Sequence, residues 1–302
     1  MGNTGMLYLV ATPIGNLEDI TLRALRVLRE ADIIAAEDTR QTLKLLNHFE
    51  IKNRLVSYYE HNKTEKGNYL IGQLMEGKDV ALVSDAGSPG ISDPGEELVG
   101  MAAEKGINVT MVPGPAAVIA GVVLSGLPSG RFGFEGFLPV NKRVRSKRIQ
   151  AVKDDTRTLV FYEAPHKLIH TLKDLRSVLG NRRISLAREL TKKFEEIWRT
   201  TLDEAIDKYE HETPKGEFVL VIEGADEEAL ERERISSWEE LSLTEHVRFY
   251  MEEGLDKKAA MKKVSEDRKI SKREVYNSLV EKKESSNKKD PAINTTGPHH
   301  RV

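Results

Sequence analysis

Four short loops in the first half of the sequence combine residue types that could bind a ligand and act on it. Each follows a short apolar run, and they read TPIGN (12–16), EDTR (37–40), SDAGSPG (84–90) and VPGPAA (112–117). Their glycines let a ligand approach main-chain atoms, and their prolines keep the loops stiff. EDTR adds two carboxylates and a guanidinium, which can exchange protons or hold anions. Each loop alone could be an ordinary turn, but four together indicate a binding site.

The third loop says most about the ligand. It continues as SDAGSPGISDPG (84–95), far longer than a turn requires, directly after the apolar run DVALV (79–83). Neither G-x-x-x-x-G-K-[ST] nor G-x-G-x-x-G occurs in the sequence, and none of the four loops contains a lysine that could hold a polyphosphate. A neutral or zwitterionic adenosine ligand, held by amides and carbonyls, therefore fits better than a nucleoside triphosphate.

The elements that must position these loops alternate along the chain. Apolar runs typical of strands cover 6–11, 32–37, 54–59, 79–85 and 108–113. Segments with helical periodicity lie between and after them, at 21–31, 39–49, 66–77, 95–106 and 115–125. This order predicts an α/β fold in which an N-terminal domain, residues 6–126, is a parallel, doubly wound sheet. Loops that follow parallel strands share one edge of the sheet, where ligands bind.

The pattern changes after residue 126. Residues 127–148 are rich in glycine, proline and basic residues and are interpreted as a basic linker. A second α/β domain, 149–224, is predicted to hold a mixed sheet, because three of its apolar runs are close in sequence. A helix-turn-helix-like module is expected at 238–284, with helices at 242–253, 256–266 and 271–284. The tail 285–302 has no periodicity and is predicted to be disordered.

Composition excludes several classes of protein. The 302 residues include no cysteine, which rules out disulfides, thiolate metal sites and cysteine nucleophiles and fits a cytoplasmic location. The eight histidines are scattered without metal-binding spacing, so a metal is not required. The longest mostly apolar stretch, 116–127, is too short to span a membrane. The net charge of -2 means that any contact with nucleic acid must use a local basic patch.

Several segments resemble a known family in both order and spacing. They are LVATPIGNLEDIT, AAEDTR, SDAGSPGISDPG, VPGPAA, FEGFLP, FYEAPHK, RELTKKFEEIWR and GEFVLVIEG. Together they resemble the S-adenosylmethionine-dependent tetrapyrrole-methylase superfamily and, within it, the family of methyltransferases I of small-subunit ribosomal RNA. The resemblance implies a two-domain fold with the methyl donor S-adenosylmethionine in the cleft, a homodimer, and methylation of a cytidine ribose 2′-oxygen in 16S rRNA of the small ribosomal subunit.

The resemblance also implies where the methyl donor binds. Gly87-Ser88-Pro89 matches a Gly-Asp-Pro turn of the superfamily, and since Ser88 replaces the aspartate, Asp85 could contact the ribose instead. With the loop residues included, the expected donor site comprises Pro13, Gly15, Asp85, Gly87, Ser88, Pro89, Ala116, Ala117, Glu163, Ala164 and Leu190. Lys167, Thr200 and Ala116 depart from the residues expected in the family, but no loop is lost.

Catalysis on a ribose needs help from the protein, because a hydroxyl is a poor nucleophile until its proton is removed or its charge is stabilised. Glu37 or Asp38 could be the base, and Arg40 and Lys192 could hold RNA phosphate or stabilise the oxyanion. The alternative is that Glu37 and Asp38 only cap the helix that begins near Thr39.

Two basic clusters could contact RNA phosphates. One lies at 141–148, and the other lies within 254–284, where ten basic and six acidic residues leave a net charge of +4. The candidate residues are Lys142, Arg143, Arg145, Lys147, Arg148, Lys262, Lys263, Lys272 and Arg273. The alternatives are a solvated linker and helices that merely pack together. Two other functions remain open: a methyltransferase acting on tetrapyrroles such as corrinoid or siroheme precursors, and a non-catalytic RNA-binding protein with the same fold.

Overall fold

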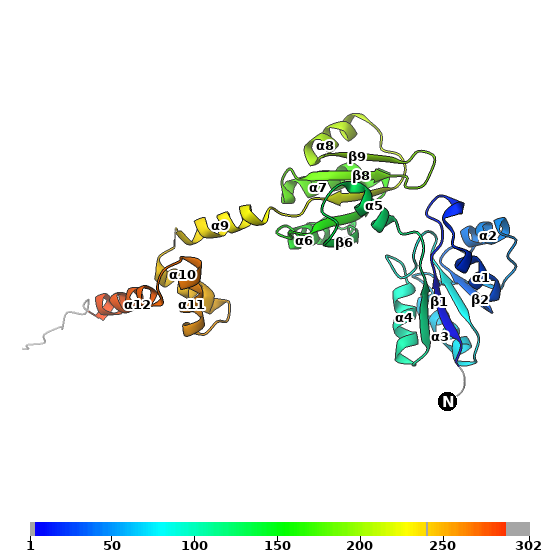
Figure 1. The fold of residues 1–302 in the computed structure, drawn as a ribbon, viewed down its shortest axis with the longest axis horizontal. Helices are drawn as coiled ribbons and strands as arrows, with labels where there is room; N and C mark the ends of the chain where they lie inside the picture. Colours follow the sequence, from blue (N-terminus) through cyan, green and yellow to red (C-terminus); the bar gives the residue numbers. More distant parts are fainter. Residues whose placement is uncertain (1–3, 240, 288–302) are drawn as a thin grey trace, which may run out of the picture. The chain divides into compact units, whose positions relative to one another are not determined.

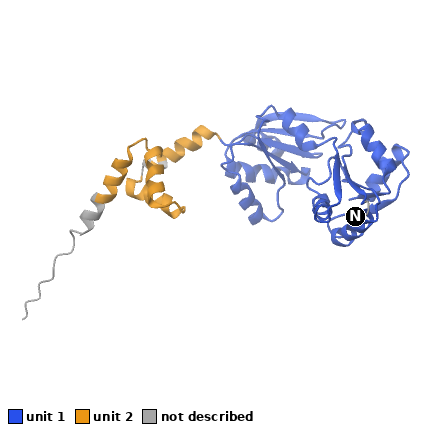
Figure 2. Ribbon diagram, turned by 60° about the horizontal axis from the view of Figure 1, so that its bottom comes forward, with its two compact units in different colours: residues 1–225 blue, residues 226–302 orange. Residues whose placement is uncertain are grey.

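The computed structural model describes residues 4–239 and 241–287. The chain divides into two compact units, and the boundary between them in the sequence follows Ala225 (Figure 2). Unit 1, up to Ala225, contains two five-stranded sheets, and unit 2, from Asp226 onward, is helical (Figure 1). Among the described residues, no helix is both long enough and apolar enough to cross a membrane.

The first sheet of unit 1 is parallel throughout, which confirms the doubly wound prediction. Its strands lie in the order β3-β2-β4-β1-β5, with bounds β1 (Met6–Val10), β2 (Ile33–Ala36), β3 (Leu55–Ser57), β4 (Val80–Val83) and β5 (Asn108–Val112). Its helices are α1 (Leu22–Glu30), α2 (Thr39–His48), α3 (Lys63–Met75) and α4 (Gly95–Glu104). Alternate residues of β2 enter two cores on opposite faces, one with α3 and α4 and the other with α1 and α2.

The second sheet is mixed, also as predicted. Its order is β6-β7-β10-β8-β9, with bounds β6 (Phe132–Phe137), β7 (Thr158–Glu163), β8 (Arg183–Arg188), β9 (Glu196–Thr201) and β10 (Phe218–Ile222). The pair β6 and β7 is parallel, and the other pairs are antiparallel. Helices α6 (Lys142–Ala151), α7 (Leu168–Leu179) and α8 (Leu202–His211) cover one face and share its core.

Helix α5 (Ala117–Ser125) connects the two sheets. It follows β5 of the first sheet but packs on the second, where Val118 and Val122 join a core with β7, β8 and β10. A Cβ at Gly121 would lie 2.7 Å from Val219 Cγ1, so only glycine allows this approach. Arg199 of β9 donates to the carbonyls of Leu124 and Ser125 at 2.6 and 3.1 Å, and so satisfies the last turn of the helix.

The segment 127–148 is not a simple linker, which corrects the sequence interpretation. It contains β6 and the greater part of α6. The glycines of this segment suggested a linker, but an edge strand tolerates glycine at a bulge. Gly136, at φ +64°, lies at such a bulge in β6. Asn141 caps α6 by accepting from the amides of Arg143 and Val144. The division of the chain at 126 and 149 remains a prediction about domains.

Unit 2 contains the three helices expected in the C-terminal module. They are α10 (Leu243–Glu252), α11 (Lys257–Asp267) and α12 (Lys272–Asn287), and they share a core of Val247, Tyr250, Ala260, Val264 and Val275. A further helix, α9 (Glu227–Glu239), covers an acidic stretch for which no helix was predicted. Residues 285–287, expected to begin a disordered tail, are helical, and the rest of that tail lies outside the described residues.

A buried polar cluster completes unit 2. His246 is fully buried and stacks between Trp238 and Tyr250, with ring centroids 4.9 and 5.2 Å away. Arg268 donates to His246 Nδ1 at 3.1 Å and to the carbonyls of Trp238 and Leu241. Burial, and then the charge of Arg268, lower the pKa of His246, so the ring stays neutral. These polar groups therefore serve to hold the helices together.

Candidate functional site

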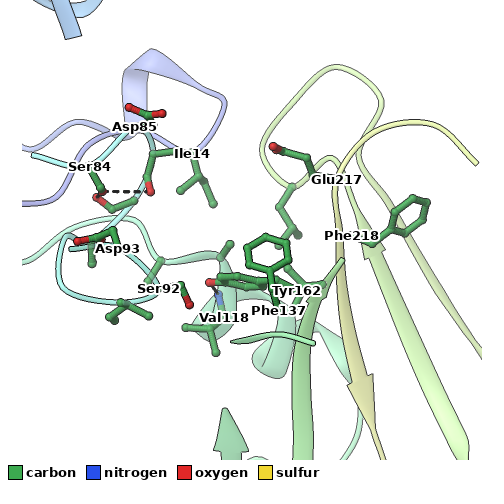
Figure 3. Close-up of a pocket in the computed structure, with 18 of the residues that line it drawn as sticks. Ile14, Ser84, Asp85, Ser92, Asp93, Val118, Phe137, Tyr162, Glu217 and Phe218 are labelled. Atoms are coloured by element: carbon green, nitrogen blue, oxygen red, sulfur yellow. Dashed lines mark hydrogen bonds between the residues drawn. The ribbon is translucent and has the colours of Figure 1, made fainter. Parts of the chain in front are cut away.

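A cavity of ≈ 300 Å³ lies between the two sheets of unit 1. One wall consists of the loops that follow β1, β2, β4 and β5, and the other consists of β6, β7, the end of β8 and the start of β10 (Figure 3). The lining includes Ile14, Glu37, residues 84–88, residues 91–93, residues 116–118, Phe137, residues 162–164, Ala187, Glu189, Leu190, Lys192 and residues 217–219. The loops singled out in the sequence thus meet at one edge of the parallel sheet.

The loops after β1 and β4 are fastened to each other. Thr12 and Gly87 exchange two backbone hydrogen bonds, of 2.9 and 3.0 Å. Gly87 has φ +83°, and a Cβ there would lie 3.2 Å from Ile14 Cγ2. Ser88 donates to the carbonyl of Pro115 at 3.3 Å and so links the loop after β5. The result is a rigid floor of small residues, which explains why the loop at 84–95 needs its glycines.

The loop after β2 separates the roles of its acidic residues. Asp38 caps α2 by accepting from the Arg40 amide at 2.8 Å and also binds the Arg40 guanidinium at 2.8 and 3.0 Å. The hydrogen bonds from the Arg40 side chain and backbone lower the pKa of Asp38 to about 2. Asp38 is therefore a helix cap, which was the alternative to a role as the catalytic base. The backbone amide of Asp38 donates to Asp85 Oδ1 at 2.8 Å. Asp85, which was predicted to contact the ribose of the donor, therefore uses one carboxylate oxygen to hold this loop.

Glu37 is in a different situation. It lines the cavity, and within the part of the chain that the structure describes its carboxylate has no hydrogen-bond or ion-pair partner. Burial raises the pKa of Glu37, and the charges of Asp85, Asp93 and Asp38 raise it further. A carboxylate whose pKa is displaced toward neutrality is better suited to accept a proton than an ordinary one.

The opposite wall depends on Tyr162, which sequence analysis missed. Its hydroxyl oxygen accepts the amide of Val118, in the first turn of α5, at 3.0 Å. Its ring makes edge contacts with Phe134 and Phe137, at centroid distances of 4.9 and 5.5 Å. Burial raises the pKa of Tyr162, so it remains a neutral phenol. Its position inside FYEAPHK, beside Glu163, was the available signal.

Glu163 lines the cavity, but its carboxylate is occupied. It accepts the Ala164 amide at 2.8 Å and the Thr171 hydroxyl at 2.5 Å, and the residue is buried. These bonds fix the short turn η2 (Pro165–Lys167) that precedes α7. Glu163 therefore shapes the wall, with Ala164 and Leu190 beside it in the lining.

Lys192 reaches the cavity from the hairpin that joins β8 to β9. Its Nζ lies 2.9 Å from Glu189 Oε1 and 2.9 Å from Glu217 Oε2. Burial of the ammonium acts to lower its pKa, but the hydrogen bonds that it donates to Glu189 and Glu217 outweigh burial, and the pKa of Lys192 is raised. Lys192 therefore stays charged and is a positioned cation, not a proton acceptor.

Of the predicted donor-site and catalytic residues, five are not in the cavity lining: Pro13, Gly15, Pro89, Asp38 and Arg40. Gly15 acts indirectly, because a Cβ there would lie 2.4 Å from Lys192 Cγ and 2.8 Å from Thr191 Oγ1. The loop after β1 and the β8–β9 hairpin thus touch at the margin of the cavity. The lining residues that were not predicted include Ile14, Phe137, Tyr162 and Glu217.

The predicted RNA-binding residues lie on three helices. Lys142, Arg143, Arg145, Lys147 and Arg148 are on α6, Lys262 and Lys263 on α11, and Lys272 and Arg273 on α12. Arg145 and Arg148 bind Asp174 and Glu135, each at 2.6 Å, so they are partly neutralised. Lys142, Arg143 and Lys147 are exposed, and among the described residues they have no ion-pair partner.

Comparison with known proteins settles the family. A family model described as tetrapyrrole (corrin/porphyrin) methylases matches residues 6–206. The chain belongs to this family. A protein from Halalkalibacterium halodurans named "Ribosomal RNA small subunit methyltransferase I" is 53% identical to the chain and is aligned over 90% of it and 94% of the relative. The Bacillus subtilis protein of the same name is 47% identical over 90% of this chain and 93% of its own length.

Another relative is shorter than this chain. The protein of the same name from Thermotoga maritima is 47% identical over 220 residues, which are 99% of that protein but only 73% of this chain. Solved structures confirm the fold: uroporphyrin-III-C-methyltransferase from Thermus thermophilus has a TM-score of 0.52 at 22% identity, over 72% of this chain and 94% of that one. Diphthine synthase has a TM-score of 0.55 at 16% identity, over 72% and 89%.

Proposed function

We propose that this methyltransferase transfers a methyl group from S-adenosylmethionine to the ribose 2′-oxygen of a cytidine in 16S rRNA of the small ribosomal subunit. The observation that carries the proposal is the 53% identity to a relative of that name over 90% of the chain. Family membership implies a donor of the S-adenosylmethionine type. The resemblance carried by the sequence motifs adds the cytidine and the 2′-oxygen.

The cavity fits such a donor. Its volume of ≈ 300 Å³ is at the lower end of the range for ligand sites, about 300–1,000 Å³. Gly87, Ala116 and Ala117 leave room that larger side chains would fill. These residues, with Asp85 and Ser88 on one side and Ala164 and Leu190 on the other, would hold the donor. Once bound, the donor supplies an electrophilic methyl group on a sulfonium leaving group.

The chain's own part in the reaction is to orient a ribose and remove its proton. Glu37 is the base in this proposal, because its carboxylate faces the cavity without a partner and has a raised pKa. Lys192, kept charged by Glu189 and Glu217, stabilises the oxygen as it gains negative charge, or holds an adjacent phosphate. Asp38 and Arg40 hold the Glu37 loop in place.

RNA binding is proposed for exposed cations on α6 and in unit 2. Lys142, Arg143 and Lys147 follow Phe137 of the cavity wall closely in the chain and are free to meet phosphates. Unit 2 supplies Lys272 and Arg273, exposed near the start of α12. Such contacts add affinity in a salt-dependent way and carry little sequence information.

A homodimer in the cytoplasm completes the proposal. Met111 on the edge strand β5 and Ile119, Val123 and Leu124 on α5 are exposed apolar side chains that a second subunit could cover. Sedimentation should give about twice the mass of the 34.0 kDa chain. A fully active monomer at micromolar concentration would refute the dimer.

The deciding experiment uses small ribosomal subunits from cells that lack this modification. Labelled S-adenosylmethionine and the purified protein should transfer label to 16S rRNA, and mapping should place it on one cytidine ribose. Uroporphyrinogen III serves as the alternative acceptor in a parallel reaction. Label on the tetrapyrrole and none on rRNA would overturn the proposed function.

A further inference from the structure

The hairpin between β8 and β9 presents an aromatic ring to solvent at the margin of the cavity. The side chain of Phe194 is 68% exposed, although Leu190 and Lys192 of the same hairpin line the cavity. Burial normally stabilises a phenylalanine side chain, so an isolated exposed ring on an ordered turn calls for an explanation.

The turn that carries this ring is rigid. The Lys192 amide donates to the Glu189 carbonyl at 3.0 Å, and the Glu195 amide donates to the Lys192 carbonyl at 3.1 Å. The Glu195 carboxylate in turn accepts the Thr191 amide at 2.6 Å. A flexible loop would lose entropy on ordering a ring against a ligand, whereas this turn has already fixed its backbone.

The same turn stores backbone strain. Glu189 and Thr191 have φ values of +50° and +66°, a region that residues with a Cβ rarely adopt. Thr191 Oγ1 is buried, and among the described residues it has no hydrogen-bond partner. Strain of this kind persists where the surrounding structure over-determines the backbone, and it is concentrated at ligand clamps.

The chemistry beside the ring indicates its partner. Lys193 Nζ lies 5.7 Å from the Phe194 ring centroid, and within the described part of the chain Lys193 has no carboxylate partner. An exposed ring with an unpaired cation beside it matches a nucleotide, which offers a flat base to the ring and a phosphate to the ammonium. A protein partner would need a larger apolar patch, whereas the residues next to Phe194 are Lys193 and Glu195.

We infer that Phe194 is a stacking platform for an unpaired nucleobase of the RNA substrate and that Lys193 binds a neighbouring phosphate. The inference rests on the proposed function and extends it. Methylation of a ribose inside a cavity requires the nucleotide to leave the stacked strand, and the exposed bases must then find other surfaces. A ring at the cavity margin offers one of them without blocking the donor.

The experiment compares four variants with the parent protein on small ribosomal subunits that lack the modification. Phe194→Ala should weaken subunit binding about five- to a hundredfold, the usual effect of removing one stacked base contact. Phe194→Trp should restore binding, whereas Phe194→Leu, which is apolar but not aromatic, should not. Lys193→Ala should lower the slope of log affinity against log salt by about one, since one phosphate contact is lost. Phe194→Ala should leave that slope unchanged.

Two measurements keep the inference separate from the proposed function. All variants should bind S-adenosylmethionine as the parent does, because neither side chain lines the cavity. If the parent itself does not methylate the subunits, the proposed function fails. If the parent methylates them and Phe194→Ala binds within twofold of it, only the stacking inference fails. Conversion of a dimer to a monomer by Phe194→Ala would place the ring in a subunit interface and also overturn the inference.

Discussion

The two compact units differ in where their polar side chains lie: those of unit 1 line a cavity, and those of unit 2 bind one another in a helical core. In unit 1, Glu37 and Lys192 face a cavity bounded by glycine and alanine. In unit 2, the buried polar groups bind one another: Arg268 donates to His246, and Tyr250 donates to Asp267 at 2.5 Å. Among the described residues the Glu37 carboxylate has no partner and is available to a substrate, whereas the polar groups of unit 2 bind one another inside a helical core and stabilise the fold.

The comparisons with known proteins also distinguish unit 1 from unit 2. The family model ends at residue 206, inside unit 1, and the Thermotoga maritima protein is matched over 99% of its length by 220 residues of this chain. This supports the proposal that the reaction belongs to unit 1, and we propose that unit 2 adds contacts with a large substrate. The following experiments could break or sharpen that division.

The largest effect is expected at the cavity floor. Gly87→Val places a branched side chain at φ +83° against Ile14, and Ala117→Phe fills the cavity, so each should weaken donor binding by about 100-fold or more. Gly72→Val is the control, since a Cβ there meets nothing within 4 Å. Calorimetry with S-adenosylmethionine measures the effect, and circular dichroism checks the fold. Unchanged donor affinity in both cavity variants would place the donor elsewhere.

The second effect separates the two neighbouring carboxylates. Glu37→Gln should slow single-turnover methylation by about 100-fold or more, while donor and subunit affinities stay near the parent's. Asp38→Asn should methylate nearly as fast as the parent, because asparagine also caps a helix. The parent's rate should rise with pH through the raised pKa of Glu37, and that rise should vanish in Glu37→Gln. Equal rates for parent and Glu37→Gln would exclude Glu37 as the base.

The third experiment removes unit 2. A chain ending at Ala225 keeps every residue of the cavity lining and should bind the donor within twofold of the parent. Its affinity for small subunits should fall by about tenfold or more at low salt, with a shallower salt dependence, because phosphate contacts are lost. An unchanged salt slope would show that unit 2 does not contact RNA.

A smaller effect is expected from single cations of unit 2. Lys272→Ala and Arg273→Ala should each reduce the salt slope by about one, since among the described residues neither has an ion-pair partner. Lys262→Ala is the matched control, because Lys262 lies 3.6 Å from Glu266 and is partly neutralised. Equal salt slopes for all three variants would contradict the prediction that cations without a carboxylate partner contribute more to RNA binding than Lys262 does.

The smallest effect is on stability. The pKa of Glu37 is raised in the folded state, so its contribution to stability is complete below the unfolded pKa and is lost as the pH rises through the folded value. Glu37→Gln removes that loss and should therefore raise the melting temperature slightly at pH 7.5 but not at pH 4. Thermal unfolding at both pH values provides the test. A melting temperature lowered at pH 7.5 would contradict the raised pKa.

The sequence predicted the parallel sheet well because β2 and β4 are apolar runs buried on both faces, which few other structures require. It predicted the cavity floor because SDAGSPG has few alternatives to a tight, ligand-facing loop. It could not separate Glu37 from Asp38, because the raised pKa of Glu37 depends on burial and on Asp85 of the loop after β4, whose carboxylate binds the Asp38 amide from 47 residues away in the chain. It missed Tyr162, whose bond to the Val118 amide depends on α5 packing on the second sheet.

The place of β10 in the second sheet sets the order in which the protein can assemble during synthesis. This strand lies between β7 and β8, yet it is the last strand in the chain. Helix α5 emerges from the ribosome about a hundred residues earlier, and the sheet surface that covers its apolar face stays incomplete until Phe218–Ile222 is inserted between β7 and β8. The nascent chain thus carries an incompletely covered helix until the last strand of the second sheet is made. Chains interrupted shortly before β10 should be the ones that aggregate and recruit chaperones.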